Sequence, residues 1–288
     1  MNNALEAMLD QYDPQNNTER KNAVREILQE IALSGLSRTD FFRKAAFYGG
    51  SCLRIFYGLN RFSEDLDFAL LEKDPDFKLD EYLDDLRKEF ISFGIDISVE
   101  TQNKKIITPV QSAFIKGNTL MLFMSLFPKS DDAKKIVSNQ KIKIKLEIDT
   151  ENPAGGKTEY RYRMLPSPFE VQVFDEPTLF AGKIHAILCR EYKNHVKGRD
   201  YYDYLFYAGR HTAINIKYLE NKLRNSGKID SSTDLSLEQV KQLLENKFND
   251  VNYQSAKEDV SAFIHDKNSL MFWKPELFIS TLDDLRAV

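Results

Sequence analysis

The stretch GGSCLRIFYGLNRFSEDLDFALL, from Gly49 to Leu71, places two glycines, a serine and two alternating aspartates in one short segment. It follows the apolar run AAFY, so the glycines fall where a short strand is predicted to end. Glycine allows a sharp backbone turn there, and the exposed N–H groups would lie at the N-terminus of a helix predicted over CLRIFYG. Gly49, Gly50 and Ser51 are therefore candidates for binding a phosphate group.

The two aspartates of this stretch are predicted to share one face of a strand. In EDLDFALL, Leu66 and Phe68 alternate with Asp65 and Asp67, and alternate residues of a strand point to the same side. Two carboxylates so close repel each other unless cations neutralise them. Mg²⁺ prefers oxygen ligands, and two such ions about 3.5–4 Å apart can activate an attacking hydroxyl and stabilise a leaving pyrophosphate. Asp65 and Asp67 are thus candidate ligands of two magnesium ions; the alternative is a solvated edge strand.

A third carboxylate is expected from a second strand. QKIKIKLEIDT has the clearest alternation in the chain, with isoleucine and leucine on one face. The other face carries Lys141, Lys143, Lys145, Glu147 and Asp149. Glu147 is the first choice for the third metal ligand and Asp149 the second.

Composition limits the classes of protein to which the chain can belong. Its 288 residues are 42% hydrophobic and 29% charged, as in ordinary globular proteins, and the net charge of −4 argues against general binding of polyanions. Basic residues nevertheless cluster within 129–145 and 183–199, where either group could attract phosphates. The N-terminus does not resemble a signal peptide, and the longest apolar run, TLMLFMSLF, is shorter than the ~20 residues of a membrane-spanning helix. The two cysteines fit no disulfide framework, so we expect a cytoplasmic protein without a membrane partner.

The order of predicted elements indicates an α+β fold. Helices are expected over TERKNAVREILQEIALSGL, with Thr18 as its cap, and over DEYLDDLRKEFISFG; strands are expected over IDISVE and on both sides of a turn at Lys116–Asn118. After Pro177 the predicted elements are all helices. The predicted domains are residues 1–172, with a mixed sheet and helices, and residues 173–288, which are helical.

Four motifs together resemble a known family. YGGSCLRIFYGLNRFSEDLDF, KIKLEIDT, LFAGKIHAIL and KGRDYYDY follow one another from Phe47 to about Tyr207. In this order they resemble the AbiEii/AbiGii toxin family, which includes the MenT toxins and is part of the polymerase-β-type nucleotidyltransferase superfamily. The first motif is specific and the others moderately so, and the C-terminal third carries no motif of this kind.

The resemblance implies roles for individual residues. Gly49, Gly50, Ser51, Arg61 and Ser63 would bind the nucleotide. Asp65, Asp67, Glu147 or Asp149 would hold two Mg²⁺ ions. Lys183, on a predicted amphipathic helix, would contact nucleotide phosphate, although a lysine there is commonly an exposed surface residue. Asp200 would act as a base or orient the acceptor hydroxyl, and its alternative is a favourable charge at a helix N-terminus.

The resemblance also implies a reaction and partners. The expected activity is Mg²⁺-dependent transfer of a nucleoside monophosphate from an NTP to an acceptor hydroxyl, with the tRNA 3′ end as acceptor. The chain would be the toxin of a toxin–antitoxin pair, with its antitoxin encoded upstream. Two alternatives remain open at this point: a small-molecule or protein hydroxyl as acceptor, and a non-catalytic nucleotide-binding module.

Overall fold

The computed structural model describes residues 3–12, 14–101, 109–118, 141–191, 195–232 and 234–288. The chain forms two compact units. The first contains Met1–Phe56, Phe62–Asn152 and Glu159–Val173, and the second contains Tyr57–Arg61, Pro153–Thr158 and Phe174–Val288. The sequence predicts a single division after residue 172, whereas the main division lies at 173/174 and two short segments before it also join the second unit.

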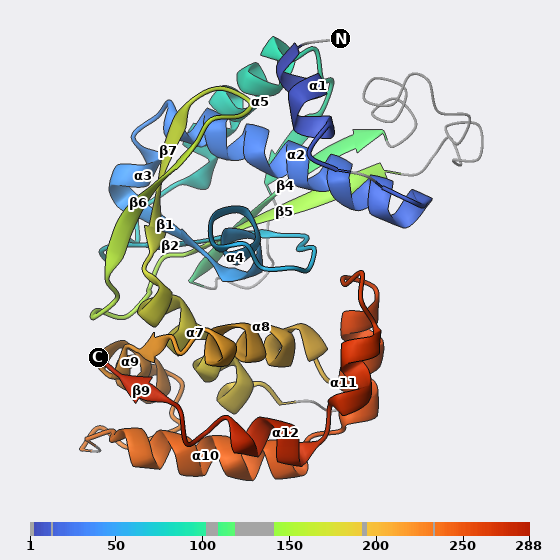
Figure 1. The fold of residues 1–288 in the computed structure, drawn as a ribbon. Helices are drawn as coiled ribbons and strands as arrows, with labels where there is room; N and C mark the ends of the chain where they lie inside the picture. Colours follow the sequence, from blue (N-terminus) through green and yellow to red (C-terminus); the bar gives the residue numbers. More distant parts are fainter. Residues whose placement is uncertain (1–2, 13, 102–108, 119–140, 192–194, 233) are drawn as a thin grey trace. The chain divides into compact units, whose positions relative to one another are not determined.

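The first unit is built on a mixed sheet of seven strands in the order β3-β4-β5-β2-β1-β7-β6 (Figure 1). The strands are β1 (Ala45–Tyr48), β2 (Leu66–Leu70), β3 (Ser98–Thr101), β4 (Val110–Asn118), β5 (Lys141–Asp149), β6 (Thr158–Arg163) and β7 (Phe169–Phe174). β2 runs parallel to β5 and antiparallel to β1, while β1 runs parallel to β7. The mixed sheet and the helical second unit confirm the predicted α+β fold.

The helices of the first unit are α1 (Asn3–Leu9), α2 (Asn17–Ser37), α3 (Phe41–Lys44), α4 (Gly49–Tyr57), the 3₁₀ turn η1 (Leu79–Tyr82) and α5 (Leu83–Ser92). α2 packs on α5 and on β5 (Figure 1). It begins one residue before the predicted cap, because the side chain of Asn16 accepts a hydrogen bond from the backbone N–H of Glu19 at 3.0 Å. An asparagine in this position satisfies one of the N–H groups that the first helical turn leaves unpaired.

The turn predicted at Lys116–Asn118 is wrong. These residues continue β4, where Lys116, Gly117 and Asn118 pair with Lys143, Ile142 and Lys141 of β5. The Lys-Gly-Asn sequence is typical of a hairpin turn, but the long partner strand β5 supplies backbone hydrogen bonds along the whole segment. The strand predicted over Thr119–Phe127 lies outside the described residues.

Aromatic side chains fill the core of the first unit. Phe68 of β2 lies between Phe41 and Phe47, with ring centroids 5.0 and 5.2 Å away, and all three rings are fully buried. Burial of such rings is a large apolar contribution to stability. Since Phe68 directly follows Asp67, the same strand anchors the sheet on one face and presents a carboxylate on the other.

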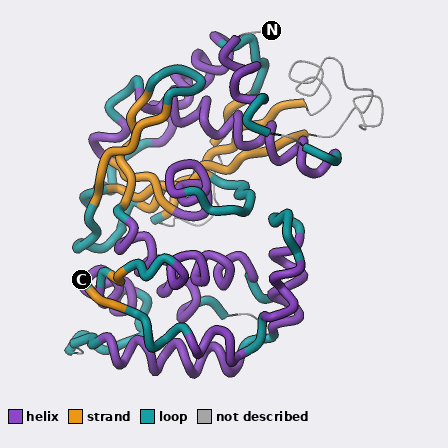
Figure 2. The backbone as a smooth tube through the Cα atoms, in the orientation of Figure 1, coloured by secondary structure: helices purple, strands orange, loops and turns teal. Residues whose placement is uncertain are grey.

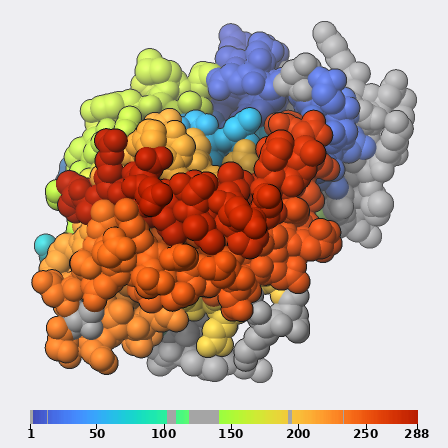
Figure 3. Space-filling view, turned by 60° about the horizontal axis from the view of Figure 1, so that its bottom comes forward, coloured from blue at the N-terminus to red at the C-terminus, as the bar shows by residue number. Residues whose placement is uncertain are grey.

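The second unit consists mainly of helices (Figure 2). They are α7 (Glu176–Cys189), α8 (Gly198–Gly209), α9 (Ile216–Asn225), α10 (Leu237–Asp250), α11 (Tyr253–Ser261), the 3₁₀ turn η3 (Asn268–Phe272) and α12 (Pro275–Ser280). Two short parallel strands, β8 (Ala213–Ile214) and β9 (Arg286–Ala287), pair with each other. The surface of α10, α11 and α12 is coloured orange to red in Figure 3.

Tight packing between helices α7, α8, α10 and α12 forms the core of the second unit. Tyr204 of α8 lies 5.0 Å from Phe248 of α10, which in turn lies 5.3 Å from Phe278 of α12. Gly198 begins α8 against α11, and a Cβ atom at this position would lie 1.8 Å from the carbonyl oxygen of Ala256. Only glycine therefore permits this approach of the two backbones.

Candidate active site

The acidic face of the first unit is set by the pairing of β2 with β5. Asp67 is the direct partner of Glu147, and Ala69 is the partner of Asp149. Asp65 immediately precedes β2, and its side chain, like those of Asp67 and Glu147, is half-buried. Glu147 and Asp149 share this face, but only Glu147 lies directly opposite Asp67, so the pairing favours Glu147 over Asp149 as the acid that accompanies Asp67.

Helix α4 begins directly beside this acidic face. Gly49 adopts a φ of +80°, and a Cβ atom at this position would lie 2.5 Å from Oδ2 of Asp67. Any other residue would therefore be strained and would also displace the carboxylate. The unpaired N–H groups of the first helical turn consequently lie near Asp67, in the position that the sequence predicts for a phosphate.

The hydroxyl of Ser51 has a structural partner. It donates a hydrogen bond to the backbone carbonyl of Asp65 and lies 3.3 Å from the amide nitrogen of Gln29, which donates to it. The same amide donates to the carbonyl of Ser63 at 3.2 Å. With only 1% of its surface exposed, Ser51 fixes the segment that leads into β2, and its backbone N–H is the better candidate for a phosphate contact.

A cationic side chain already lies on the acidic face. Nζ of Lys145 is 2.6 Å from Oε1 of Glu147, and the hydroxyl of Ser112 donates to the same oxygen at 3.3 Å. Asp149 instead accepts a hydrogen bond from the backbone N–H of Glu151 at 3.0 Å. Its carboxylate is therefore occupied within its own turn, whereas Glu147 binds a positive charge.

The carboxylates of the acidic face suit Mg²⁺ in the type of ligand atom and in their positions on paired strands. Carboxylate oxygens are the preferred ligands of this ion, and Asp67 and Glu147 occupy paired positions on one face. Within the described part of the chain, no three Asp, Glu, His or Cys side chains converge in an arrangement that could hold a metal ion. Because Glu147 is paired with Lys145, its side chain would have to rotate away from that lysine for a metal ion to bind.

The second unit contains a buried cluster of charges around Lys183. Its Nζ lies 2.8 Å from Oδ1 of Asp200 and 2.8 Å from Oδ2 of Asp203, and its side chain is 13% exposed. Asp200 lies in the first turn of α8, as predicted, but it also contacts Nη1 of Arg190. Lys183 is thus held between two carboxylates and is not an exposed surface lysine.

Arg61 belongs to the same cluster. Its Nε and Nη2 atoms donate to the two oxygens of Asp203 at 2.6 and 2.7 Å, and the side chains of Arg61 and Asp203 are 3% and 0% exposed. This bidentate geometry engages the Nε–Nη2 edge of the guanidinium. The nucleotide contact that the resemblance implies for Arg61 is therefore not favoured by its position.

The carboxylates of this cluster are kept ionised by their partners. Burial alone would raise the pKa of Asp200, but Lys183 and Arg190 lower it more, so the pKa lies below the usual aspartate value. The same balance, with Arg61 and Lys183 as the cations, lowers the pKa of Asp203. A carboxylate with a lowered pKa accepts a proton poorly, so the geometry favours a positioning role for Asp200 over a role as general base.

A known protein family matches most of this chain. Residues 31–280 match the family described as "Nucleotidyl transferase AbiEii toxin, Type IV TA system". The chain belongs to the AbiEii family. It is therefore a nucleotidyltransferase toxin of the type IV toxin–antitoxin class, as the resemblance predicts. No curated protein matches the sequence.

A solved structure, that of MenT4, shares the fold of this AbiEii family member. MenT4, a nucleotidyltransferase toxin from Mycobacterium tuberculosis H37Rv, superposes with a TM-score of 0.59 at 15% identity, over 98% of this chain and 90% of that one. JHP933 from Helicobacter pylori gives a TM-score of 0.48 at 18% identity, over 90% and 92% of the two chains. At 15% identity, the likeness to MenT4 concerns the fold alone. Among the described residues, no helix is long and apolar enough to cross a membrane.

Three residues of these sites do not figure in the sequence prediction. Asp203 could have been found, because it lies three residues after Asp200 in RDYYDY and so shares a face of the same helix. No such sequence signal marks Arg190 or Gln29. The partner of Arg190 lies 10 residues away in sequence, and the partners of Gln29 lie at least 22 residues away.

The basic clusters are only partly described. Residues 129–140 and 192–194 lie outside the described ranges. On β5, Lys141 and Lys143 are exposed on the same face as Glu147. Arg199 has a structural setting, since its guanidinium lies 4.1 Å from the ring of Phe263 and its backbone N–H donates to Asp259.

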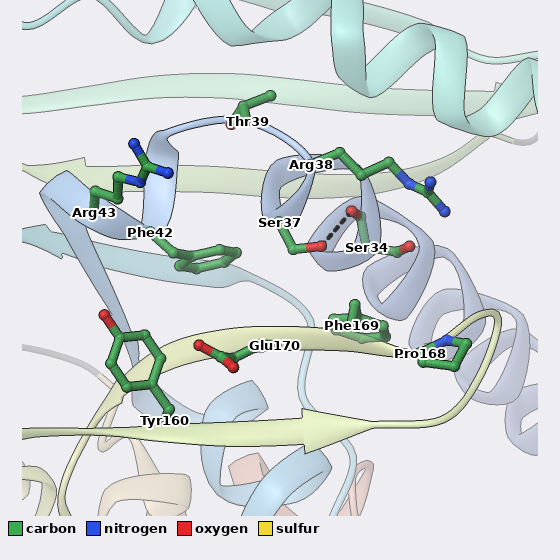
Figure 4. Close-up of a pocket in the computed structure, with 10 residues that line it drawn as sticks. All are labelled: Ser34, Ser37, Arg38, Thr39, Phe42, Arg43, Tyr160, Pro168, Phe169 and Glu170. Atoms are coloured by element: carbon green, nitrogen blue, oxygen red, sulfur yellow. Dashed lines mark hydrogen bonds between the residues drawn. The ribbon is translucent and has the colours of Figure 1, made fainter.

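A separate pocket of the first unit has a volume of about 440 Å³ (Figure 4). Arg43, Phe42, Tyr160 and Glu170 are among the residues that line it. None of the predicted site residues lines this pocket, so we do not assign it to the reaction.

Proposed function

We propose that this toxin catalyses Mg²⁺-dependent transfer of a nucleoside monophosphate from an NTP to an acceptor hydroxyl, with release of pyrophosphate. One observation carries the proposal: the N-terminus of α4 begins against Asp67, and Asp67 is the direct strand partner of Glu147. The N-terminus of a helix and a pair of carboxylates thus lie side by side in one unit, and we infer that the N–H groups of that helix bind phosphate.

Each group would have a defined part in the reaction. The backbone N–H groups of Gly49, Gly50 and Ser51 would bind phosphate oxygens and fix the triphosphate. Asp65, Asp67 and Glu147 would hold Mg²⁺, with Asp149 as the less favoured alternative; when bound, the metal supplies charge neutralisation at the phosphates and lowers the pKa of the attacking hydroxyl.

The bonding changes are those of phosphoryl transfer. The acceptor oxygen forms a bond to the α-phosphorus, the bond from that phosphorus to the bridging oxygen breaks, and pyrophosphate leaves with the bonding electrons. The proton of the acceptor hydroxyl passes to a carboxylate of the acidic face or to water. Such chemistry requires mainly positioning and electrostatic stabilisation, which α4 and the acidic face would provide.

RNA is the acceptor that the surface supports best, and we propose the tRNA 3′ end. Lys141 and Lys143 are exposed on the strand face that carries Glu147, so a phosphate backbone could follow β5 toward the carboxylates. The family implies an antitoxin, and we expect its gene upstream and the toxin in the cytoplasm. A cationic small molecule as acceptor would predict acidic residues in the places of these lysines.

The test is incubation of the purified chain with total RNA and each α-labelled NTP in turn. We expect one NTP to label a small RNA in a Mg²⁺-dependent manner, and Asp67→Asn to abolish the labelling. Asp76→Asn, which alters an exposed carboxylate outside the acidic face, is the control and should label normally. Labelling of protein or of a small molecule would change the acceptor, and NTP binding without transfer to any acceptor would favour the non-catalytic module.

A further inference from the structure

The charges around Lys183 alternate in sign along a single series of contacts. The series runs Arg61, Asp203, Lys183, Asp200, Arg190, and every neighbour in it is an ion-pair partner of the next. Five charges therefore form one connected group within the second unit. We refer to these five residues as the charge series.

Exposure of the three cations rises toward one end of the charge series, while both carboxylates stay buried. Arg61 and Asp203 are 3% and 0% exposed, Lys183 is 13% exposed, and Arg190 reaches 42%. Each buried charge has an opposite charge on at least one side, as stable burial requires. Arg190, at the exposed end, contacts one carboxylate that it shares with Lys183.

Positive charge is in excess at the exposed end. Lys197 is half-buried next to this end, and no ion pair of its ammonium occurs among the described residues. Burial and the charge of Arg190 lower the pKa of Lys197, and Asp200 opposes them only in part. Over the whole charge series and Lys197, four cations accompany two carboxylates; the excess of two positive charges is one that an anion beside the exposed Arg190 would neutralise.

We propose that Arg190 and Lys197 form a phosphate-binding site of the second unit, with Asp200 and Lys183 as the residues that position Arg190. A guanidinium held on one side by a carboxylate can present its remaining N–H groups to two phosphate oxygens. Lys197 adds a compact charge beside it. The ligand is a phosphate group, either of the NTP or of the RNA acceptor, and this identification rests on the proposed function.

The proposal gives Lys183 a different role from the direct phosphate contact implied by the family resemblance. Its ammonium already has two carboxylate partners at 2.8 Å. A phosphate would have to compete with both, whereas Arg190 and Lys197 lie at the exposed end of the series. Lys183 then acts on the ligand through Asp200 and Arg190.

The experiment measures binding by titration calorimetry with two separate probes, inorganic tripolyphosphate and a short single-stranded RNA. We expect Arg190→Gln to weaken binding of at least one probe about tenfold or more, because it removes charge-assisted hydrogen bonds. Arg190→Lys should be intermediate, and Lys197→Gln should have a smaller effect in the same direction. Weaker binding of tripolyphosphate alone identifies the NTP as the source of the phosphate, and weaker binding of RNA alone identifies the acceptor.

The matched control is Arg210→Gln. Arg210 is 48% exposed and pairs with a single carboxylate, Glu176, at 3.0 Å, so it resembles Arg190 in exposure and pairing. Its replacement should leave both affinities unchanged, and melting curves should show every variant to be folded. The proposal is wrong if Arg190→Gln binds both probes as well as Arg210→Gln does, or if the wild-type chain binds neither.

Failure of the proposed function would give a different pattern. Neither binding measurement requires nucleotide transfer, so a chain that labels no acceptor could still lose tripolyphosphate affinity on replacement of Arg190. A folded Lys183→Gln variant that loses binding while Arg190→Gln keeps it would place the phosphate contact at Lys183 and overturn the proposal.

Discussion

The two units of this toxin treat their carboxylates in opposite ways. Asp67 and Glu147 lie half-buried on one face of a sheet, and Nζ of Lys145 lies 2.6 Å from Oε1 of Glu147. Asp200 and Asp203 are 1% and 0% exposed, and each contacts two cations. Under the proposed function, carboxylates of the first kind would exchange their partner for a metal ion, whereas those of the second kind are held by buried ion pairs.

This difference separates two effects that a mutation can have. Removal of a half-buried carboxylate should reduce activity with little change in stability, because water can replace its contacts. Removal of a fully buried and paired carboxylate leaves uncompensated buried cations and should reduce stability. The following experiments test this contrast in order of decreasing expected effect.

The largest effect on activity should follow Asp67→Ala. We expect transfer to fall by several orders of magnitude, since a metal ligand is lost. The melting temperature should stay the same or rise slightly, because repulsion within the acidic face is relieved. Labelled-NTP transfer and thermal melting measure the two quantities; near wild-type transfer would exclude the metal role of this residue.

Glu147→Gln and Asp149→Asn should differ strongly from each other. Glu147 is the direct partner of Asp67, while Asp149 is the partner of Ala69 and caps its own turn. We expect a loss of orders of magnitude for Glu147→Gln and a far smaller loss for Asp149→Asn. Equal and mild losses in the same transfer assay would mean that β5 does not contribute a ligand.

Asp203→Asn should reduce stability most. Arg61 would stay buried without its bidentate partner, a change that costs about 3–5 kcal/mol in comparable buried pairs. The folded-state pKa of Asp203 is lowered from 3.8, so its contribution is present above the unfolded pKa and is lost as pH falls through the folded pKa. Urea unfolding across a pH series should therefore show a lower free energy of unfolding for the variant than for the wild type near neutral pH. The difference between the two should be smaller in acid.

Gly49→Ala combines strain with displacement of a carboxylate. A φ of +80° costs an alanine about 1–2 kcal/mol, and its Cβ would also displace Asp67. Gly94→Ala is the control, because Gly94 has a φ of +73° with no atom within 4 Å of an added Cβ. Both variants should lose the stability that the backbone strain costs, but only Gly49→Ala should lose transfer. Equal transfer activity in the two variants would mean that the N-terminus of α4 takes no part in the reaction.

The smallest effect concerns the lysines of β5. If they contact only RNA phosphates, neutralisation of Lys141 or Lys143 should each lower the salt dependence of RNA binding by about 0.7 in the log–log slope. Sequence preference should change little. Affinities over a salt series measure this slope, and an unaltered slope in the double variant would place the RNA elsewhere.

Local sequence patterns were sufficient for many elements of the fold. The alternation in residues 141–149 predicts β5, and the apolar spacing in residues 18–36 predicts α2 to within one residue at its start. The turn at Lys116–Asn118 was predicted wrongly, because its residues favour a hairpin locally while pairing with β5 continues the strand. Propensity over three residues is a weak preference that several hydrogen bonds of a sheet outweigh.

The sequence by itself determined the residue types and the order of the motifs, and hence the family and the acids that are candidates for the metal. Tertiary structure decided which of those residues are neighbours. Strand register paired Glu147, and not Asp149, with Asp67, and ion pairing placed Arg61 with Asp203 across 142 residues of sequence. The reason is physical: alternation fixes the face of a strand to which a side chain points, but the charge that lies opposite it depends on how distant segments pack.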